Sequence, residues 1–304
     1  MLHEELKQSA DRLMYYLRTQ LTPNGFEART FYGEIFTLLG CEYSDSECTF
    51  TQDLVKGHVE KLKTLEEARQ HQEFHLYAYS LLSPAYQAFF DAPNLHFKHT
   101  IRAKPTNWIL LRGIAKIRFG SIFEKQFWKW ILLIVIQYNT RDGFILDRGI
   151  GAMIRKEEKD VYLSDQYQAF MLVLLTDLFD LTKNPLYLTS FEKGLTALLS
   201  HQTETGEIIR FGRGRKQIFG YGSILYALSW SIIKQHKDEH VSSLRQIFMH
   251  VRSFQNTDGS FPLVLTKGDD PSMWERYNNL FDYLPFLATM LYRSAHLLKK
   301  DSVS

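Results

Sequence analysis

Cysteine is scarce in this 304-residue chain, which contains only Cys41 and Cys48. These two thiols could close a small loop, but a single pair does not indicate an oxidising compartment. No group of cysteines and histidines has the spacing of zinc ligands, and the 11 histidines are scattered. The sequence therefore predicts no metal site and no cofactor.

An excess of charge is also missing, because 36 lysines and arginines are balanced by 34 acids and leave a formal net charge of +2. This balance gives no electrostatic reason to expect nucleic-acid binding. Long hydrophobic runs are absent too, since the most apolar stretch, 130–136, is too short to span a bilayer. The N-terminal segment lacks the basic and apolar regions of a signal peptide, so we expect a cytoplasmic protein.

Aromatic residues are abundant, with 22 phenylalanines and 16 tyrosines. They suit the core of a large helical fold, or a concave site that stacks sugar rings. Apolar residues recur with helical periodicity, which predicts about ten helices and no substantial sheet. The first helix carries Leu6, Leu13, Leu17 and Leu21 along one side and ends before Pro23-Asn24-Gly25; the others begin at 35 or cover 60–82, 108–117, 123–138, 166–181, 185–201, 220–235, 241–255 and 277–298.

Related turns follow four of the predicted helices, at 21–29, 137–147, 201–212 and 255–265. Each turn has polar residues, a glycine and then an apolar residue, and the last three carry a glutamine near the helix end. A helical hairpin cannot bury its apolar face alone, whereas hairpins that stack and close into a ring can do so. The repeat therefore favours one all-α domain over 1–304, a complete or incomplete α/α toroid, rather than an irregular helical bundle.

Five segments carry a family resemblance: PTNWILLRGIAKIRFG at 105–120, DGFILDRG at 142–149, SDQYQAFMLVLL at 164–175, RFGRGRKQIFGYGSILYAL at 210–228, and DGSF with WERYNNLFDYLPFLATML within 258–291. In order and character they resemble the toroid domains of carbohydrate-active enzymes, namely polysaccharide lyases of the heparinase and alginate-lyase type and their relatives. The resemblance implies an enzyme that acts on a poly- or oligosaccharide.

The first group of candidate site residues is Asn107 with Trp108, at a helix start. In the resembling lyases, such an asparagine binds and neutralises the substrate uronate, which lowers the pKa of the C5 proton and permits β-elimination. The alternative is a helix cap, with Trp108 packed against the fold.

The second group is Asp142, Asp147 and Asp165 with Tyr167, which resembles the inner-rim loop and helix of the family. The family often carries a histidine where this chain has Gln168, and glutamine cannot carry a proton. Tyr167 would serve as base and acid if a nearby cation lowered its pKa. The alternative role for the aspartates is to make turns and cap helices.

The third group is a motif rich in glycine and arginine, directly before a predicted helix. The glycines let the backbone bend sharply, so that guanidinium groups can bind a carboxylate, sulfate or phosphate. The following helix N-terminus adds partial positive charge. Pairing with the aspartates and binding of a nucleic-acid phosphate are the alternatives. The motif contains Arg210, Gly212, Arg213, Gly214, Arg215, Gln217 and Tyr221.

The fourth group surrounds the start of the last predicted helix, where the alternative is a capped helix with solvated charges. Its aromatic residues would stack on sugar faces, and its glutamate would be a carboxylate catalyst. Asn278 and Asp282 are four residues apart and therefore share a face. The group consists of Trp274, Glu275, Tyr277, Asn278 and Asp282.

These residues predict cleavage of an acidic, uronate-containing saccharide by β-elimination. Asn107 and Arg213 or Arg215 would hold the uronate, and Tyr167 or Tyr221 would move the proton. One alternative is a glycoside hydrolase in which two of the carboxylates act as a pair. Another is a toroid that only binds a glycan or a protein. An isoprenoid-cyclase-like enzyme is the last alternative, although its acid cluster is absent and TDLFD at 176–180 is the nearest approach to its metal box.

Overall fold

A computed structural model of the chain describes residues 1–22, 25–28, 30–44, 71–88, 104–148, 163–266 and 279–301. Most of the regular structure in these ranges is helical, and the strands form two small antiparallel hairpins. One hairpin pairs β1 (Leu21–Thr22) with β2 (Gly25–Phe26), and the other pairs β3 (Thr140–Arg141) with β4 (Phe144–Ile145). The predicted all-α class is confirmed.

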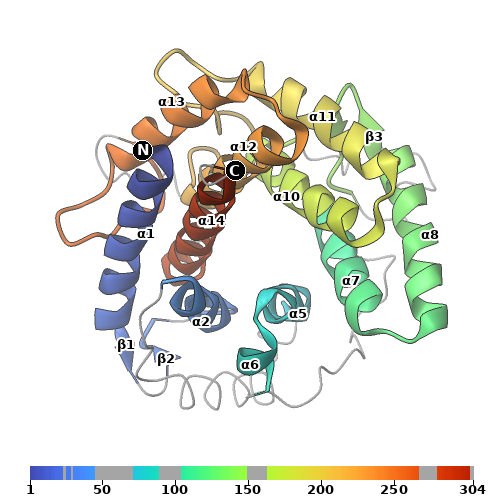
Figure 1. Ribbon diagram of the computed structural model, residues 1–304, viewed down its shortest axis with the longest axis horizontal. Helices are drawn as coiled ribbons and strands as arrows, with labels where there is room; N and C mark the ends of the chain where they lie inside the picture. Colours follow the sequence, from blue (N-terminus) through green and yellow to red (C-terminus); the bar gives the residue numbers. More distant parts are fainter. Residues whose placement is uncertain are drawn as a thin grey trace.

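Six of the described helices form an inner ring, in which each helix contacts the next (Figure 1). The last of them packs against the first, so the ring closes between the two ends of the chain. The inner helices are α2 (Gly33–Tyr43), α5 (Gln72–Leu81), α7 (Thr106–Phe119), α10 (Asp165–Thr182), α12 (Ile218–Gln235) and α14 (Leu280–Asp301).

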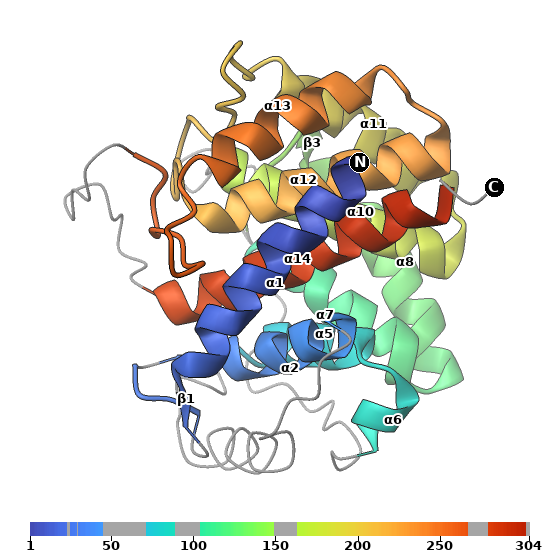
Figure 2. The same cartoon turned by 60° about the vertical axis from the view of Figure 1, so that its left-hand side comes forward.

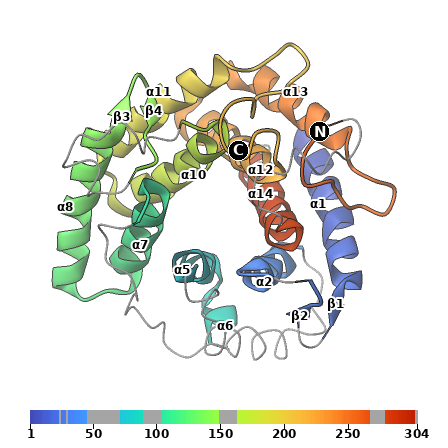
Figure 3. The ribbon, with the colours of Figure 1, turned by 180° about the vertical axis from the view of Figure 1, so that it is seen from behind.

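Four described helices lie outside the ring, as the views in Figures 2 and 3 also show. Each of them packs on an inner helix: α1 on α14, α8 on α7, α11 on α10 and α13 on α12. From α7 onward the chain alternates between the inner and the outer layer, so successive inner helices run in the same direction. The outer helices are α1 (Leu2–Thr19), α8 (Ile122–Asn139), α11 (Pro185–Leu199) and α13 (His240–Arg252), and α6 (Pro84–Gln87) is a single turn after α5.

Helix boundaries follow from local signals in the sequence. Ser121 and Glu124 form a reciprocal capping box at the start of α8. Asn184 caps α11, whose first residue is Pro185. The expected first helix is shorter than the leucine pattern suggested, because α1 ends at Thr19 and Leu21 begins β1.

The glycine turns lock neighbouring outer helices together. Gly143, Gly206 and Gly259 all have positive φ, at 85°, 83° and 95°, a region that side chains disfavour. A Cβ atom on any of them would collide with the backbone of the next outer helix. The nearest carbonyl oxygens would lie 2.7 Å away at Lys193 in α11, 2.2 Å away at Gln246 in α13 and 2.2 Å away at Arg12 in α1. The repeated glycine turn that the sequence predicts is therefore the place where one helical hairpin packs against the next.

Phenylalanines from five inner helices fill the middle of the ring. The ring centroids of Phe219 and Phe286 lie 4.1 Å apart, and those of Phe170 and Phe219 lie 4.9 Å apart. Phe74 stacks on Phe170 at 5.6 Å, and Phe36 meets Phe286 edge-on at 5.3 Å. Many of the aromatic residues therefore form the core, which was one of the two roles that the composition suggested.

A buried polar network joins four inner helices below this aromatic layer. Arg293 donates to Asp177 over 2.7 Å and to the hydroxyl of Tyr226 over 2.8 Å, and Tyr77 donates to Asp177 over 2.7 Å. Asp180 accepts a hydrogen bond from the indole of Trp230. Both aspartates of the TDLFD segment therefore have partners within the fold.

Candidate functional site

The N-termini of the inner helices meet around one rim of the ring. Each is linked to its neighbour by a side-chain contact or a hydrogen bond, apart from the α7–α10 step. There β4 and Asp147 lie between the two helices, and the backbone N–H of Ile145 in β4 donates to Gln168 in α10. The links are Phe31–His71 and His71–Trp108 between rings, Asn107–Asp147 and Gln166–Gln217 by hydrogen bonds, Phe219–Tyr283 between rings, and Asp282 to the backbone of Tyr32. Residues far apart in the sequence are thus gathered on one circle.

Asp147 lies where α7 meets the segment that follows β4. Thr106 donates to the carbonyls of Leu146 and Arg148 and ties this segment to the start of α7, while the backbone N–H of Asn107 donates to Asp147 over 3.4 Å. Burial raises the pKa of Asp147 to about 6, against the opposing effects of the Asn107 N–H and the charge of Arg213. Three predicted site residues, Asn107, Asp147 and Arg213, therefore act on one another.

Three amide side chains, at the N-termini of α7, α10 and α12, are almost fully buried, and each has a hydrogen-bonding atom that is not used. Asn107 Oδ1, Gln166 Oε1 and Gln217 Nε2 have no hydrogen-bond partner. Gln166 donates to Gln217 over 3.2 Å, and a Cβ atom on Gly214 would lie 2.1 Å from the Gln166 amide. Burying an unsatisfied amide atom costs about 1–3 kcal/mol, so these three amides have hydrogen-bonding capacity that the described contacts leave unused.

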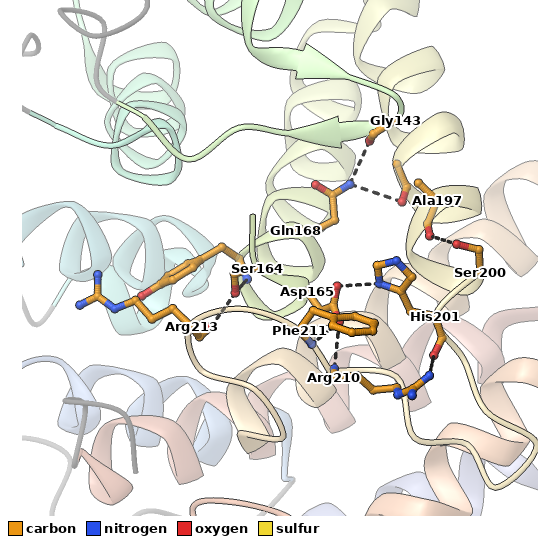
Figure 4. A network of polar contacts seen from close by, with 12 residues as sticks. Gly143, Ser164, Asp165, Gln168, Ala197, Ser200, His201, Arg210, Phe211 and Arg213 are labelled. Carbon is orange, nitrogen blue, oxygen red and sulfur yellow. Dashed lines mark hydrogen bonds and ion pairs between the residues drawn. The ribbon is translucent and has the colours of Figure 1, made fainter. Parts of the chain in front are cut away.

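The glycine–arginine segment is fastened to the start of α10 by Asp165 (Figure 4). One carboxylate oxygen of Asp165 accepts from the backbone N–H groups of Arg210 and Phe211, both over 2.8 Å, and the other lies 2.8 Å from Nδ1 of His201. Ser164 donates to the carbonyl of Arg213 over 2.5 Å. The expected sharp bends are confirmed, since Gly212 and Gly214 have φ values of 75° and 76°.

The three arginines of this segment differ in their surroundings. Arg213 is half-buried and close enough to Asp147 to lower the pKa of its carboxyl. Arg215 is exposed, and Arg210 is exposed beside the ring of Phe211. Of the three, Arg213 is the one that the structure places in electrostatic contact with Asp147.

Some predicted residues lie away from this arc. Tyr221 is buried between α12 and α13, where its hydroxyl lies 3.3 Å from Nε2 of His250, and burial raises its pKa well above the ordinary value. Asp142 is exposed at the outer turn between β3 and β4. Neither position suits the proton-carrying or substrate-binding role that the sequence suggested, because neither side chain reaches the rim.

Two other predicted residues, Asp282 and Tyr167, lie at the N-termini of inner helices. Asp282 is buried and accepts from the backbone N–H groups of Phe31 and Tyr32 at the start of α2; burial raises its pKa to about 7. Tyr167 is half-buried against the core at the start of α10. The four predicted residues Trp274, Glu275, Tyr277 and Asn278 lie outside the described residues.

A charged cluster between α5 and α7 was missed by the sequence analysis. Arg112 donates to the buried carboxylate of Glu73 over 2.5 Å, and the ammonium group of Lys104 lies 3.6 Å above the ring of Trp108. Burial lowers the pKa of Lys104 to about 8, and burial together with Lys104 lowers that of His71 to about 4. Charged residues inside the apolar segments of α5 and α7 were the available signal.

The described residues contain neither a candidate metal site nor a candidate membrane span. They contain no group of three or more histidine, cysteine, aspartate or glutamate residues arranged to hold a metal ion. Among the helices in these ranges, none has the length and apolar character needed to cross a membrane.

Comparisons with known proteins give no match to a family model and no match to a curated protein. Solved structures do match over nearly the whole chain. A glycosyl hydrolase of family 88 from Bacteroides vulgatus superposes with a TM-score of 0.64 and 10% identity, and the match covers 96% of this chain and 99% of that one. A polysaccharide lyase gives 0.62 and 11%, with 99% of both chains covered.

An unsaturated glucuronyl hydrolase specific for heparin gives a TM-score of 0.60 and 14% identity, over 97% of this chain and 98% of that chain. The chain has the α/α-toroid fold. The toroid's resemblance to carbohydrate-active enzymes is thus confirmed at the level of fold, which by itself does not assign an activity.

Proposed function

We propose that the toroid is a carbohydrate-active enzyme that cleaves a glycosidic bond in an acidic saccharide. The site would be the arc of the rim from α7 through α10 to α12. Solved structures described as glycosyl hydrolases and as a polysaccharide lyase share its fold. The observation that carries the proposal is the buried carboxyl of Asp147, whose pKa is raised to about 6 between Asn107 and Arg213.

Asp147 supplies the proton in this proposal. A carboxyl with a pKa near 6 keeps its proton in about half of the molecules at pH 6 and in about one-tenth at pH 7, and it gives the proton up readily. Donation of that proton to the glycosidic oxygen makes the departing sugar a neutral alcohol. Hydrolysis and β-elimination both need this step, because both break the bond to that oxygen.

The neighbouring groups suit a sugar with a negative charge. The unused amide atoms of Asn107, Gln166 and Gln217 include acceptors and a donor, which is what hydroxyl groups require. The guanidinium of Arg213, close to Asp147, would bind a carboxylate or sulfate of the saccharide.

Hydrolysis is the reaction that we favour. The raised pKa of Asp147 is what a general acid in a hydrolase needs, and Tyr221, one of the two predicted proton carriers for elimination, faces α13 instead of the rim. β-Elimination remains the second candidate because Tyr167 stands at the start of α10, near Ser164, whose hydroxyl binds the arginine segment. Tyr167 would then remove the C5 proton while Asn107 and Arg213 neutralise the uronate.

The test is incubation of the full chain with a panel of acidic and neutral oligosaccharides, followed by two measurements. New reducing ends without new absorbance indicate hydrolysis, whereas a rise in absorbance at about 235 nm indicates a conjugated elimination product. With an unsaturated uronide as substrate, hydrolysis would instead remove that absorbance. Asp147→Asn should abolish either activity, and Asp142→Asn, five residues away at the outer turn, should not. Turnover on no member of the panel would reject the proposal.

A further inference from the structure

His201 lies between the two segments that carry Asp147 and Arg213. Its imidazole ring stacks on the ring of Phe144 in β4, with centroids 5.4 Å apart, and meets the ring of Phe211 edge-on at 4.9 Å. Asp147 follows Phe144 by three residues, and Arg213 follows Phe211 by two. One side chain just after the end of α11 therefore contacts both segments.

The orientation of this imidazole is fixed by Asp165 (Figure 4). Nδ1 of His201 lies 2.8 Å from one carboxylate oxygen of Asp165, and because a carboxylate only accepts hydrogen bonds, Nδ1 is the donor. The side chain of Asp165 is only 2% exposed, and that of His201 is 26% exposed. A buried acceptor at Nδ1 and an aromatic ring on either side leave the imidazole little freedom to turn.

The backbone from Phe211 to Arg213 follows the position of Asp165. The N–H of Phe211 donates to the carboxylate of Asp165 over 2.8 Å, and the carbonyl of Phe211 accepts from the N–H of Asp165 over 3.1 Å. Ser164, the residue before Asp165, donates to the carbonyl of Arg213. The arginine segment thus depends on Asp165, and His201 is a further donor to the same carboxylate.

The backbone that leads from β4 to Asp147 is held by the inner helices instead. The N–H of Ile145 donates to Gln168 in α10 over 2.9 Å, and the hydroxyl of Thr106 at the start of α7 donates to the carbonyl of Leu146 over 2.7 Å. These bonds do not involve the imidazole. If the imidazole is lost, the arginine segment is therefore the side that moves, and Asp147 stays in place.

We propose that His201 is a positioning residue that keeps the guanidinium of Arg213 beside the carboxyl of Asp147. The interaction between two charges weakens as their separation grows, so a shift of the arginine segment changes the charge that acts on Asp147. His201 acts through the segments that it contacts, because its Nδ1 is engaged with Asp165. The effect on catalysis rests on the proposed function of Asp147 as the acid, whereas the positioning itself does not.

The experiment titrates the carboxyl of Asp147 in the full chain without substrate. The aspartate carboxyls are isotope-labelled and followed by NMR as the pH changes, and the signal of Asp147 is the one that Asp147→Asn removes. Arg213→Gln gives the shift that follows from loss of the guanidinium charge. His201→Ala removes the imidazole, and His201→Asn restores a hydrogen-bond donor at the place of Nδ1. Thermal unfolding of each variant checks that the fold is intact.

Arg213→Gln should raise the pKa of Asp147 above about 6, because the charge of Arg213 holds that pKa down. His201→Ala should produce more than half of this rise, and His201→Asn should produce less than half of the rise seen in the alanine variant. Phe211→Ala, which removes the contact on the arginine side of the imidazole, should also raise the pKa. This variant keeps the test decisive if His201→Ala does not fold.

The matched control is His250→Ala. His250 is also half-buried, and its Nε2 lies 3.3 Å from the hydroxyl of Tyr221, so this variant should leave the pKa of Asp147 unchanged. A pKa of Asp147 that does not move in Arg213→Gln or in His201→Ala would overturn the proposal. So would equal shifts in the alanine and asparagine variants of His201. Absence of turnover on every saccharide would reject the proposed function alone, because the titration needs no substrate.

Discussion

The carboxylate of Asp165 lies 2.8 Å from Nδ1 of His201, and its second oxygen holds the backbone of Arg210 and Phe211 (Figure 4). Asp165 is buried at the start of α10, whereas His201 follows the end of α11. This pair therefore connects an inner helix, an outer helix and the segment that carries Arg213. Asp165 would therefore influence the candidate site through the residues that it holds in place.

We predict that Asp165→Ala lowers the free energy of unfolding by about 3 kcal/mol, since three donors lose a buried charged acceptor. The measurement is urea unfolding of the full chain. If the arginine segment also moves, KM for an acidic saccharide should rise more than kcat falls. Asp142→Asn is the control, because that carboxylate is exposed. An unchanged unfolding midpoint for the Asp165 variant would contradict this role.

Asp147 should control the pH dependence of the proposed reaction. A general acid works only while it is protonated, so kcat/KM should fall as the pH rises through about 6, where Asp147 ionises. Asp147→Asn should reduce kcat by about 10²-fold or more and remove this limb of the pH profile. A profile whose limb survives in the variant would show that another group supplies the proton.

Asp282 should make the fold less stable as the pH rises towards neutrality. Its pKa is about 7 in the folded chain against an ordinary value of 3.8, so between these values only the unfolded state has lost the proton. The free energy of unfolding therefore falls with pH in this window and levels off above pH 7. Between pH 6 and pH 7 the contribution of Asp282 should fall by about 1 kcal/mol. The lowered pKa of His71 acts in the opposite direction, so the share of Asp282 is measured as a difference between the parent and a variant.

The matching variant is Asp282→Asn, measured by urea unfolding at several pH values. Its amide oxygen can keep both backbone bonds, because Oδ1 of Asp282 accepts from Phe31 over 3.0 Å and from Tyr32 over 2.8 Å. From pH 6 to pH 7 the change in stability of this variant should be more favourable than that of the parent by about 1 kcal/mol, because only the contribution of Asp282 has been removed. Asp258→Asn should keep the original slope, because hydrogen bonds from Ser260 hold the pKa of Asp258 below its ordinary value. Equal slopes in both variants would assign the effect to another group.

Local patterns in the sequence were sufficient for the helices and for the turns between them. The glycine turns could be predicted because a position with positive φ at a helix end is usually occupied by glycine. Asn107, Asp147 and Arg213 were named as site residues from a family resemblance, and the structure places them together. These three lie on segments that the ring brings side by side, so a correct fold prediction was enough to expect their contact.

Side-chain direction was not predictable where a helix is buried on all sides. Every residue of α12 from Ile218 to Ile232 is buried, so no polar face shows which tyrosines point to the rim. Tyr221 was named because it follows the glycine–arginine motif, and it faces α13 instead. The Glu73–Arg112 pair was missed because its partners are on different helices, and charge alone does not reveal which helices are neighbours.

The glycine turns give the sharpest test of the ring itself. Gly206 has a φ of 83°, and a Cβ atom there would lie 2.2 Å from the carbonyl oxygen of Gln246 in α13. Gly206→Ala should therefore lower the free energy of unfolding by about 3 kcal/mol, through backbone strain and loss of the contact between the turn after α11 and α13.

Gly222→Ala is the matched control for this substitution. Gly222 lies within α12, and the nearest atom to its Cβ would be a methyl group of Leu287 at 3.2 Å. Alanine gains up to about 1 kcal/mol of helix propensity there, which offsets the tighter packing. Urea unfolding should then leave the Gly222 variant within about 1 kcal/mol of the parent. If the two variants were equally stable, the contact of the Gly206 turn with α13 would not stabilise the fold, and the ring would depend on inner-helix packing alone.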